Sequence, residues 1–220
     1  MMLHLHREIN ELKKKIVLEA TLVEDNLREG MKALITRDIN LAKRIIKRDK
    51  DIDAKEVEIE EDCLKIFALY QPVAKDLRYL VAFLKLNNDL ERIGDLASNI
   101  AARAKSLAKK EALEIPVEIP KMAEIVQKML KDTIDALVDL DGAKATRVLD
   151  TDDKVDEMNS TMYAIVGEKI QKNPELVDSW MQILGISRYL ERIADHCTNI
   201  CEDLEYMLSG RIQRHPSLGR

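Results

Sequence analysis

Four pairs of acidic residues recur in this sequence with one spacing, an Asp or Glu followed four positions later by an Asp. They are Asp49 with Asp53, Glu91 with Asp95, Asp152 with Asp156, and Glu191 with Asp195. Residues four apart lie one above the other on a helix, so each pair places two carboxylates on a single face. Like charges in this arrangement repel each other and are costly to bury. A compensating positive charge is therefore expected beside each pair.

A metal ion is one source of that charge. First shells made of carboxylate oxygens suit hard cations such as iron, manganese, magnesium and calcium, and helical bundles build such sites from acids on facing helices. Arginine is a second source, because the chain offers Arg78, Arg92, Arg188 and Arg192. A plain solvated face is a third explanation. We favour metal binding because the four pairs occupy equivalent positions of an internal repeat.

Two other functions stay open, a carboxylate-bridged metalloenzyme on a helical bundle and a metal-free helical scaffold. Di-iron enzymes on such bundles use Glu-x-x-His on two helices. None of the four histidines follows a Glu at that spacing: His4, His6, His196 and His215. The sequence also lacks a P-loop, a dinucleotide-binding glycine pattern and a plausible Ser/His/Asp set. We therefore predict that the protein is not an enzyme.

Long helices must carry the acidic pairs, because the chain is poor in the residues that sheets and turns require. It has 7 Gly, 5 Pro and 4% aromatic residues, whereas 34% of its residues are charged. Asp38 is expected to cap the second helix. Pro72, Pro120 and Pro174 are expected to open the third, fourth and sixth. Apolar periodicity predicts six helices, at 5–35, 38–71, 72–110, 120–140, 142–171 and 173–209.

The two halves of the sequence resemble each other. LERIGD at 90–95 returns as LERIAD at 190–195, and DKDID at 49–53 resembles DDKVD at 152–156. Between the halves lies EIPVEIP at 114–120, whose two prolines cannot remain helical. The sequence is therefore a tandem of two similar three-helix units.

We predict an all-α fold, a tandem repeat of two antiparallel three-helix bundles. The predicted segments are a first repeat at 1–112, a second at 113–210 and a flexible tail at 211–220. On the second helix of the first repeat, the acids continue an apolar stripe that Glu56 and Glu60 extend. On the third helix the acids border the solvent side. We therefore expect a site in a groove at the bundle surface.

Charge and cysteine content narrow the class of protein. A net charge of −5 argues against a dedicated nucleic-acid binder, because phosphate contacts need clustered Lys and Arg. No apolar run suits a membrane span or a secretory signal, so we expect a cytoplasmic protein. The three cysteines are expected to be reduced and buried. Cys197 and Cys201 make a poor zinc site with His196, which is expected at the surface or at the edge of the acidic site.

LERIGDLASNIA at 90–101 and LERIADHCTNIC at 190–201 each end a repeat, and they resemble the signature of the PhoU family of phosphate-signalling proteins. QPVAKDLR at 71–78 fits the family as well, and the resemblance covers residues 5–208. It implies a pair of three-helix bundles whose acidic pairs bind multinuclear iron or zinc clusters at the surface. By motif match, all eight acids of the four pairs are the implied ligands.

The resemblance also implies a role without catalysis, as a negative regulator of the phosphate-starvation response. Such proteins are understood to connect a phosphate-import ABC transporter, at its cytoplasmic ATPase subunit, to a membrane sensor histidine kinase, and they often form homodimers. The protein would then reach the membrane only through its partners. The first repeat has Leu96 where the second has His196, so we expect the two sites to differ in metal or in occupancy.

Overall fold

The computed structural model describes residues 2–209 of the chain, with side chains from 4 to 208. Its helices are α1 (Met2–Thr36), α2 (Ile39–Tyr70), α3 (Ala74–Leu107), α4 (Glu118–Asp139), α5 (Gly142–Lys172) and α6 (Val177–Ser209), with a short 3-10 turn, η1 (Pro174–Leu176), before α6. The described residues contain no strand, and the predicted all-α fold is confirmed. The tail predicted at 211–220 lies outside the described residues.

Aspartate caps fix the starts of α2 and α5, which are equivalent helices of the two repeats. A carboxylate oxygen of Asp38 accepts hydrogen bonds from the backbone N–H groups of Asn40 and Leu41, both at 2.9 Å. This is the N-cap that the sequence predicts. Asp141 accepts from the N–H of Lys144 at 3.0 Å, so a residue interpreted as part of a turn also caps a helix.

The helix starts predicted at three prolines were wrong by two or three residues. Pro72 precedes α3 because α2 ends at Gln71 in the left-handed conformation (φ 45°) and Val73 is extended (φ −128°, ψ 160°). Pro174 opens the 3-10 turn instead of α6. Pro120 is the third residue of α4, a position whose N–H needs no partner within the helix. The end of the EIPVEIP segment is therefore helical.

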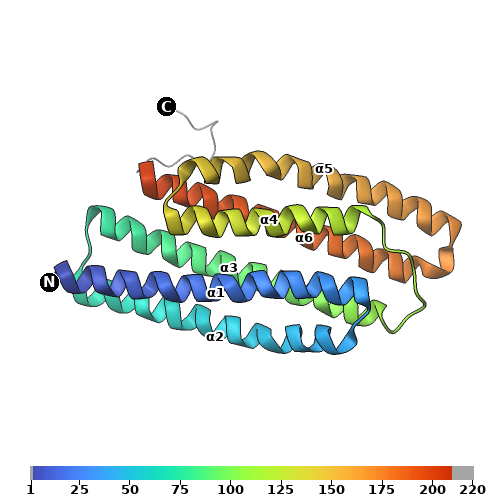
Figure 1. Ribbon diagram of the computed structural model, residues 1–220, viewed down its shortest axis with the longest axis horizontal. Helices are drawn as coiled ribbons and strands as arrows, with labels where there is room; N and C mark the ends of the chain where they lie inside the picture. The colour runs from blue at the N-terminus through green and yellow to red at the C-terminus, as the bar shows by residue number, and fades with distance from the viewer. Residues whose placement is uncertain (1, 210–220) are drawn as a thin grey trace.

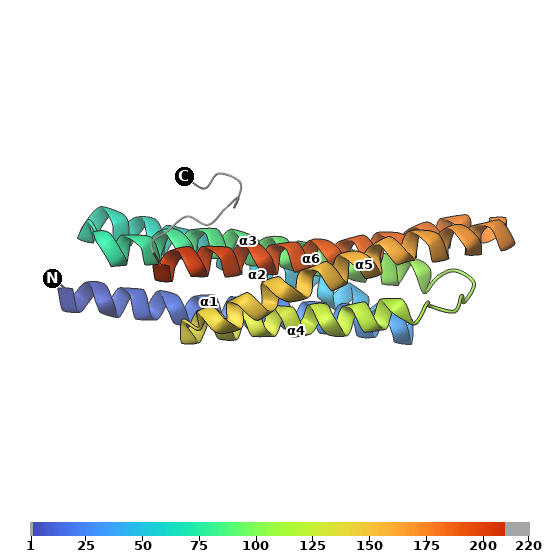
Figure 2. The same cartoon turned by 90° about the horizontal axis from the view of Figure 1, so that it is seen from above.

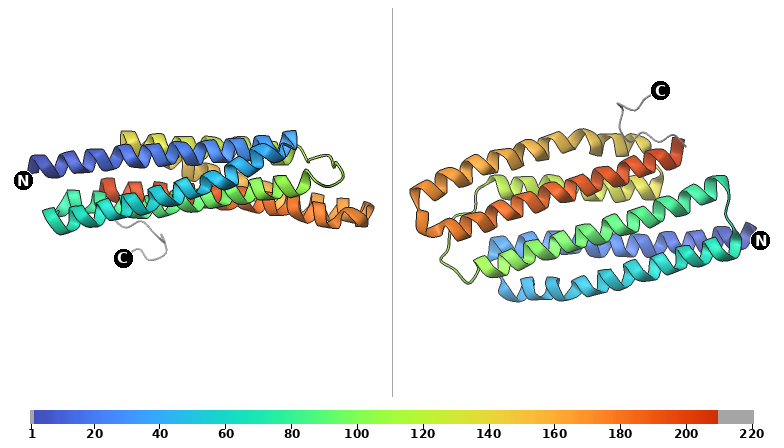
Figure 3. Two further views of the ribbon diagram at one scale, coloured as in Figure 1. Left: turned by 90° about the horizontal axis from the view of Figure 1, so that it is seen from below. Right: turned by 180° about the vertical axis from the view of Figure 1, so that it is seen from behind.

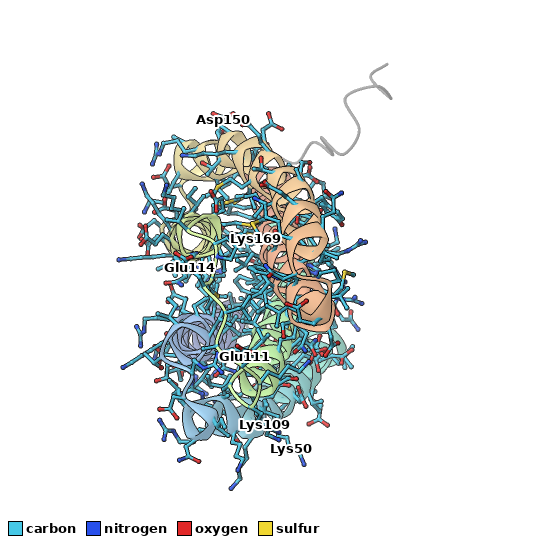
Figure 4. The ribbon with its side chains drawn as sticks, turned by 90° about the vertical axis from the view of Figure 1, so that its right-hand side faces the viewer. Lys50, Lys109, Glu111, Glu114, Asp150 and Lys169 are labelled. Atoms are coloured by element: carbon cyan, nitrogen blue, oxygen red, sulfur yellow. The ribbon has the colours of Figure 1, made fainter. Side chains whose placement is uncertain are left out.

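The six helices form two layers. α2, α3, α6 and α5 lie side by side in one layer, and α1 and α4 cover one face of it (Figure 1, Figure 2). Helices α1–α3 make one bundle and α4–α6 the other, and the bundles meet where α3 packs on α6 and α1 on α4 (Figure 3). Seen along the helices, the connection that carries Glu111 and Glu114 crosses between the bundles at one end (Figure 4).

Equivalent apolar residues fill the two bundle cores. One repeat-equivalent set at 0% exposure has a member on each helix, in the order of the chain: Val23, Ile52, Ile93, Val126, Val155 and Ile193. Fully burying a side chain of this size contributes about 1.5–3 kcal/mol. Within residues 2–209, no helix combines the length and the apolar character that a membrane crossing requires.

Polar contacts join the bundles along α3 and α6. Lys85 Nζ lies 3.0 Å from a carboxylate oxygen of Asp203. Arg103 lies over the ring of Tyr189 and donates a hydrogen bond to its hydroxyl at 3.2 Å. Gly185 leaves room for this guanidinium, because a Cβ at that position would lie 2.5 Å from Arg103 Cζ. The two bundles are therefore packed on each other through specific side chains.

Candidate metal centre

Three acids of the first bundle gather between α2 and α3. Asp49 and Asp53 come from successive turns of α2 and Asp95 comes from α3, and one oxygen of each lies within 4.8 Å of the other two. Asp49 is half-buried and the other two are exposed. Among the described residues, this is the one set of three potential metal ligands with that spacing. We call these three residues the surface cluster.

Close packing of α2 on α3 brings the surface cluster together. Asp95 follows Gly94, and Asp53 follows Ile52. A Cβ at Gly94 would lie 3.1 Å from Ile52 Cδ1, so the glycine lets the two helix backbones approach each other. The side chains next to this contact, Asp53 and Asp95, are therefore held close to one another.

Burial and mutual repulsion destabilise the charged form of these acids. Burial raises the pKa of Asp49 to about 6, and the neighbouring Ser98 hydroxyl offsets part of this rise. The charges of Asp95 and Asp53 raise it further. Asp49 Oδ1 is buried and has no hydrogen-bond partner among the described residues. Burial also raises the pKa of Glu91, and the charge of Asp95 adds to this effect. A bound cation would offset both the burial of these charges and their mutual repulsion.

The acids of the second bundle have pKa values raised by the same two causes. Burial raises the pKa of Asp152 on α5 to about 6, and the charges of Asp156 and Asp195 raise it further. Within residues 4–208, Asp152 Oδ1 is buried without a hydrogen-bond partner, as is the equivalent atom of Asp49. Burial and the charge of Asp195 raise the pKa of Glu191 on α6. The acids of the second bundle thus repel one another, although their oxygens are not gathered as closely as those of the surface cluster.

Two more acidic pairs have the same spacing, and lysine binds both. They are Glu58 with Asp62 on α2 and Asp135 with Asp139 on α4. Lys15 Nζ lies 2.5 and 2.6 Å from the first pair, and Lys144 Nζ lies 3.8 and 3.5 Å from the second. In contrast, no Lys or Arg within residues 4–208 makes an ion pair with any of the eight candidate ligands. Spacing alone does not distinguish these two classes of pair.

Arg92, Arg188 and Arg192, which were considered as an alternative source of charge, act on these acids only at a distance. Arg92 lowers the pKa of Glu91 by less than burial and the neighbouring acids raise it. Arg188 and Arg192 have a similarly minor effect on Glu191. Because none of them forms an ion pair with these acids in the described part of the chain, an arginine-balanced network does not account for the eight carboxylates. Half-buried oxygens without partners are a donor set that fits a hard metal ion.

His196 lies at the junction of the two bundles. Its Nδ1 is 2.8 Å from a carboxylate oxygen of Asp89, and the two side chains are 13% and 14% exposed. The residue follows Asp195 directly in the sequence, but its hydrogen bond reaches across to α3. It therefore links the second bundle to the helix that carries Glu91.

The three cysteines are free and buried, as predicted. Burial raises the pKa of Cys63 to about 12 and that of Cys201 to about 11. Burial raises the pKa of Cys197 as well. Because the thiolate is the form that binds a metal, these raised pKa values make the buried thiols less favourable ligands.

Glu19 of α1 is an acid near this site that the sequence reasoning did not single out. It is 0% exposed, and burial raises its pKa to about 8, with the charge of Glu56 adding to the rise. The available signal was a Glu in the apolar stripe of α1, between Ile16 and Val23. Which acids Glu19 approaches is visible only in the tertiary structure.

Fold and site together define a class of protein, a tandem of three-helix bundles with acidic pairs at equivalent places in each. The sequence model of the PhoU domain matches twice, at residues 16–104 and 119–204, once in each bundle. The chain belongs to the PhoU family.

Relatives of known name are similar over nearly the whole chain. The phosphate-specific transport system accessory protein PhoU homolog 1 of Thermotoga maritima is 35% identical over 209 residues, which are 94% of this chain and 90% of that one. The phosphate-specific transport system accessory protein PhoU of Escherichia coli K12 is 31% identical over 208 residues, which are 94% and 86% of the two chains.

Solved structures show the same fold. The crystal structure of PhoU from Pseudomonas aeruginosa has a TM-score of 0.90 at 33% identity, over 94% of this chain and 99% of that one. PhoU from Streptococcus pneumoniae has a TM-score of 0.86 at 29% identity, over 96% and 100%. The family consists of accessory and regulatory proteins and is not a known enzyme family, which confirms the prediction that this protein is not an enzyme.

Proposed function

We propose that this protein is an accessory regulator of a phosphate transport system and that its two acidic clusters bind metal ions. The names of the relatives support the first part, since both are called accessory proteins of the phosphate-specific transport system. The second part is supported by one observation above all. The four repeat-equivalent acidic pairs have no ion-pair partner in the described chain, whereas both other pairs of the same spacing are bound by lysine.

The proposed ligands are the eight acids of the four pairs. Asp49, Asp53, Glu91 and Asp95 would hold metal in the first bundle. Their equivalents on α5 and α6 would do so in the second. Iron or zinc is the proposed metal, with manganese, magnesium and calcium as other candidates. When bound, the metal supplies positive charge and open coordination positions that suit phosphate or an acidic side chain of a partner protein.

The protein's own residues would set where such a ligand binds. Gly94 holds α2 against α3, and the hydrogen bond between His196 and Asp89 fixes the first bundle against the second. Both contacts lie within two residues of a proposed ligand. The clusters would thus be carried on packed helices, which hold their spacing more precisely than loops do.

As partners we propose the cytoplasmic ATPase subunit of the transporter and a sensor histidine kinase, with this protein acting as an adaptor between them and as a homodimer. This places it in the cytoplasm. Copurification with the ATPase subunit, before and after removal of metal with a chelator, tests whether the clusters matter for the contact. Capture that needs neither the metal nor the acids would contradict a role for the clusters in binding the transporter.

Metal content of the protein purified without a chelator tests the metal site directly. Glu91→Ala with Asp95→Ala should remove the metal of the first bundle and leave the helical content unchanged. The matched control is Asp135→Ala with Asp139→Ala, a pair of the same spacing that Lys144 already binds, and it should keep all metal. Full metal content in the first variant, measured by elemental analysis, would exclude the assignment. So would wild-type protein that takes up no iron, zinc or manganese.

A further inference from the structure

Glu19 is a buried acid whose carboxylate has no hydrogen-bond partner in the described part of the chain. The residue is 0% exposed, and neither of its carboxylate oxygens is hydrogen-bonded to a residue that the structure describes. Its neighbours along the helix face, Ile16 and Val23, are apolar and buried. A charge buried alone is so unfavourable that it must be neutralised, paired or bound to a cation. The position therefore indicates a ligand or a proton at this place.

Two acids of the neighbouring helices approach Glu19. Burial raises its pKa most, and the charges of Glu56 on α2 and Glu91 on α3 raise it further, against an opposing effect of Lys55. Glu56 and Glu91 are half-buried, and neither makes an ion pair in the described chain. The three acids stand on three helices, α1, α2 and α3, each of which packs on the other two (Figure 1).

Asn87 of α3, next to the backbone of Glu56, provides another buried oxygen without a partner among the described residues. The residue is 1% exposed, and its Nδ2 donates a hydrogen bond to the backbone oxygen of Glu56 at 2.8 Å. Its Oδ1 is buried and not hydrogen-bonded. Amide oxygens bind the same hard cations that carboxylates bind. Asn87 Oδ1 is therefore an acceptor that is available to a cation between the acids and the core of the first bundle.

The second bundle shows that the fold does not require these polar groups. Its residues at the positions equivalent to Glu19, Glu56 and Asn87 are Met122, Asn159 and Ser187. Ser187 Oγ donates to Asn159 Oδ1 at 2.8 Å and lies 3.6 Å from Met122 Sδ. This equivalent set is neutral, and its side-chain oxygens are bonded to each other. The added acid is thus a feature of the first bundle alone.

We infer that Glu19, Glu56 and Glu91 form a second cation position in the first bundle, on the core side of the surface cluster, with Asn87 Oδ1 as a neutral ligand. The position takes a hard divalent ion such as Mn²⁺ or Fe²⁺. Their oxygens are less closely gathered than those of the surface cluster, so binding turns the half-buried side chains of Glu56 and Glu91 toward Glu19. This inference rests on the proposed metal-binding function and makes the two bundles unequal in metal content.

A Mn²⁺ titration of the full chain tests the inference. The background variant carries Asp156→Asn and Asp195→Asn, so that only the first bundle reports. Calorimetry and the electron paramagnetic resonance of free Mn²⁺ then count the ions bound per chain. Glu19→Gln should lower the count by one ion. Glu19→Met should do the same, and it introduces the residue that the second bundle tolerates at this position.

A control variant and three outcomes keep the test decisive. Glu24→Gln, on the same helix, should leave the count and the affinity unchanged. An unchanged count, with affinity within about twofold, in both Glu19 variants would overturn the inference; Glu19 is then a protonated acid. Loss of one ion in both supports the second position. If the background variant binds no Mn²⁺ at all, the proposed metal-binding function of the first bundle fails, and the inference fails with it.

Discussion

Gly94 of α3 packs directly on Ile52 of α2, so that a Cβ at position 94 would lie 3.1 Å from Cδ1 and 3.2 Å from Cγ2 of Ile52. At the equivalent positions the second bundle has Ala194 and Val155. The first bundle thus pairs the smaller Gly94 with the larger Ile52, and the second pairs the larger Ala194 with the smaller Val155. This exchange accounts for the single difference between LERIGD and LERIAD, and it keeps the helices that carry the acids at a similar separation.

We expect Gly94→Ala to destabilise the wild-type protein. Overpacking a core costs about 1–3 kcal/mol, which is equal to or larger than the roughly 1 kcal/mol gained when Ala replaces Gly inside a helix. The net loss should be about 1 kcal/mol in the free energy of unfolding, measured by urea denaturation. In the background of Ile52→Val, the same substitution should instead be stabilising, because the added methyl fills vacated space. An effect of the same sign in both backgrounds would contradict the compensation.

Metal should stabilise the folded protein. A ligand that binds only the folded state at a concentration of 100 times its Kd adds about 2.7 kcal/mol to the free energy of unfolding. We expect Mn²⁺ to raise the Tm of protein prepared with a chelator. The variant with Asp49→Asn and Asp152→Asn should lose most of this rise, since each change removes the negative charge of an acid whose buried Oδ1 has no hydrogen-bond partner among the described residues. A Tm that responds equally to Mn²⁺ in the variant would indicate binding elsewhere.

The metal-free protein should lose stability as the pH rises. The pKa of Glu19 is raised from 4.5 to about 8, and those of Asp49 and Asp152 from 3.8 to about 6. A carboxyl group with a raised pKa holds its proton in the folded state after the unfolded chain has released it. Its favourable contribution to the free energy of unfolding is therefore complete below the pKa of the group in the unfolded chain. Above that pKa the contribution declines by at most about 1.4 kcal/mol per pH unit, until the pH passes the pKa of the group in the folded state.

The window between pH 7 and 8 separates Glu19 from the two aspartates, because acids with a pKa of about 6 have released most of their protons above pH 7. In the presence of a chelator, the Tm of the wild type should fall across this window, and Glu19→Gln should flatten the fall. Glu11→Gln, an exposed residue of α1 paired with Lys14, should leave it unchanged. If the Tm of Glu19→Gln falls with pH as steeply as that of the wild type, other groups cause the fall.

The contact between Lys85 and Asp203 should couple the two bundles. The Asp203 side chain is 6% exposed, and that of Lys85 is 40% exposed. Lys85→Met removes this ion pair and leaves the acid buried, so we expect a loss of about 1–3 kcal/mol. The double variant with Asp203→Leu should recover most of it. Urea unfolding monitored by circular dichroism measures both, and a double variant as unstable as the single one would refute the coupling.

Several features of the fold could be predicted from the sequence because they depend on local physics. The apolar period, the cap at Asp38 and the scarcity of Gly and Pro indicate long helices, and the repeated motif indicates two bundles. The helix starts predicted at the prolines were wrong. Pro72 follows a left-handed Gln71, and the chain needs Val73 in an extended conformation before it can turn into α3. That geometry is set by where α3 must pack.

The candidate site was only partly predictable. The spacing of the acids places each pair on one helical face, which is a property of the helix alone. The same spacing occurs in Glu58 with Asp62, and both of those acids form ion pairs with Lys15 from α1. Lys15 is distant in sequence, and nothing in the local pattern of α2 reveals its presence. Which pairs lack a counter-ion follows from the way the helices pack.

The sequence by itself determined the helices, their repeat and the faces that carry the carboxylates, because these depend on residues within a few turns of one another. Only the tertiary structure decided that Glu19 approaches Glu56 and Glu91, and that the two lysine-bound pairs differ from the other four. Contacts of that kind depend on how far each helix is rotated and how closely it crosses its neighbours. Side chains such as Gly94 and Ile52 fix those quantities by packing across helices.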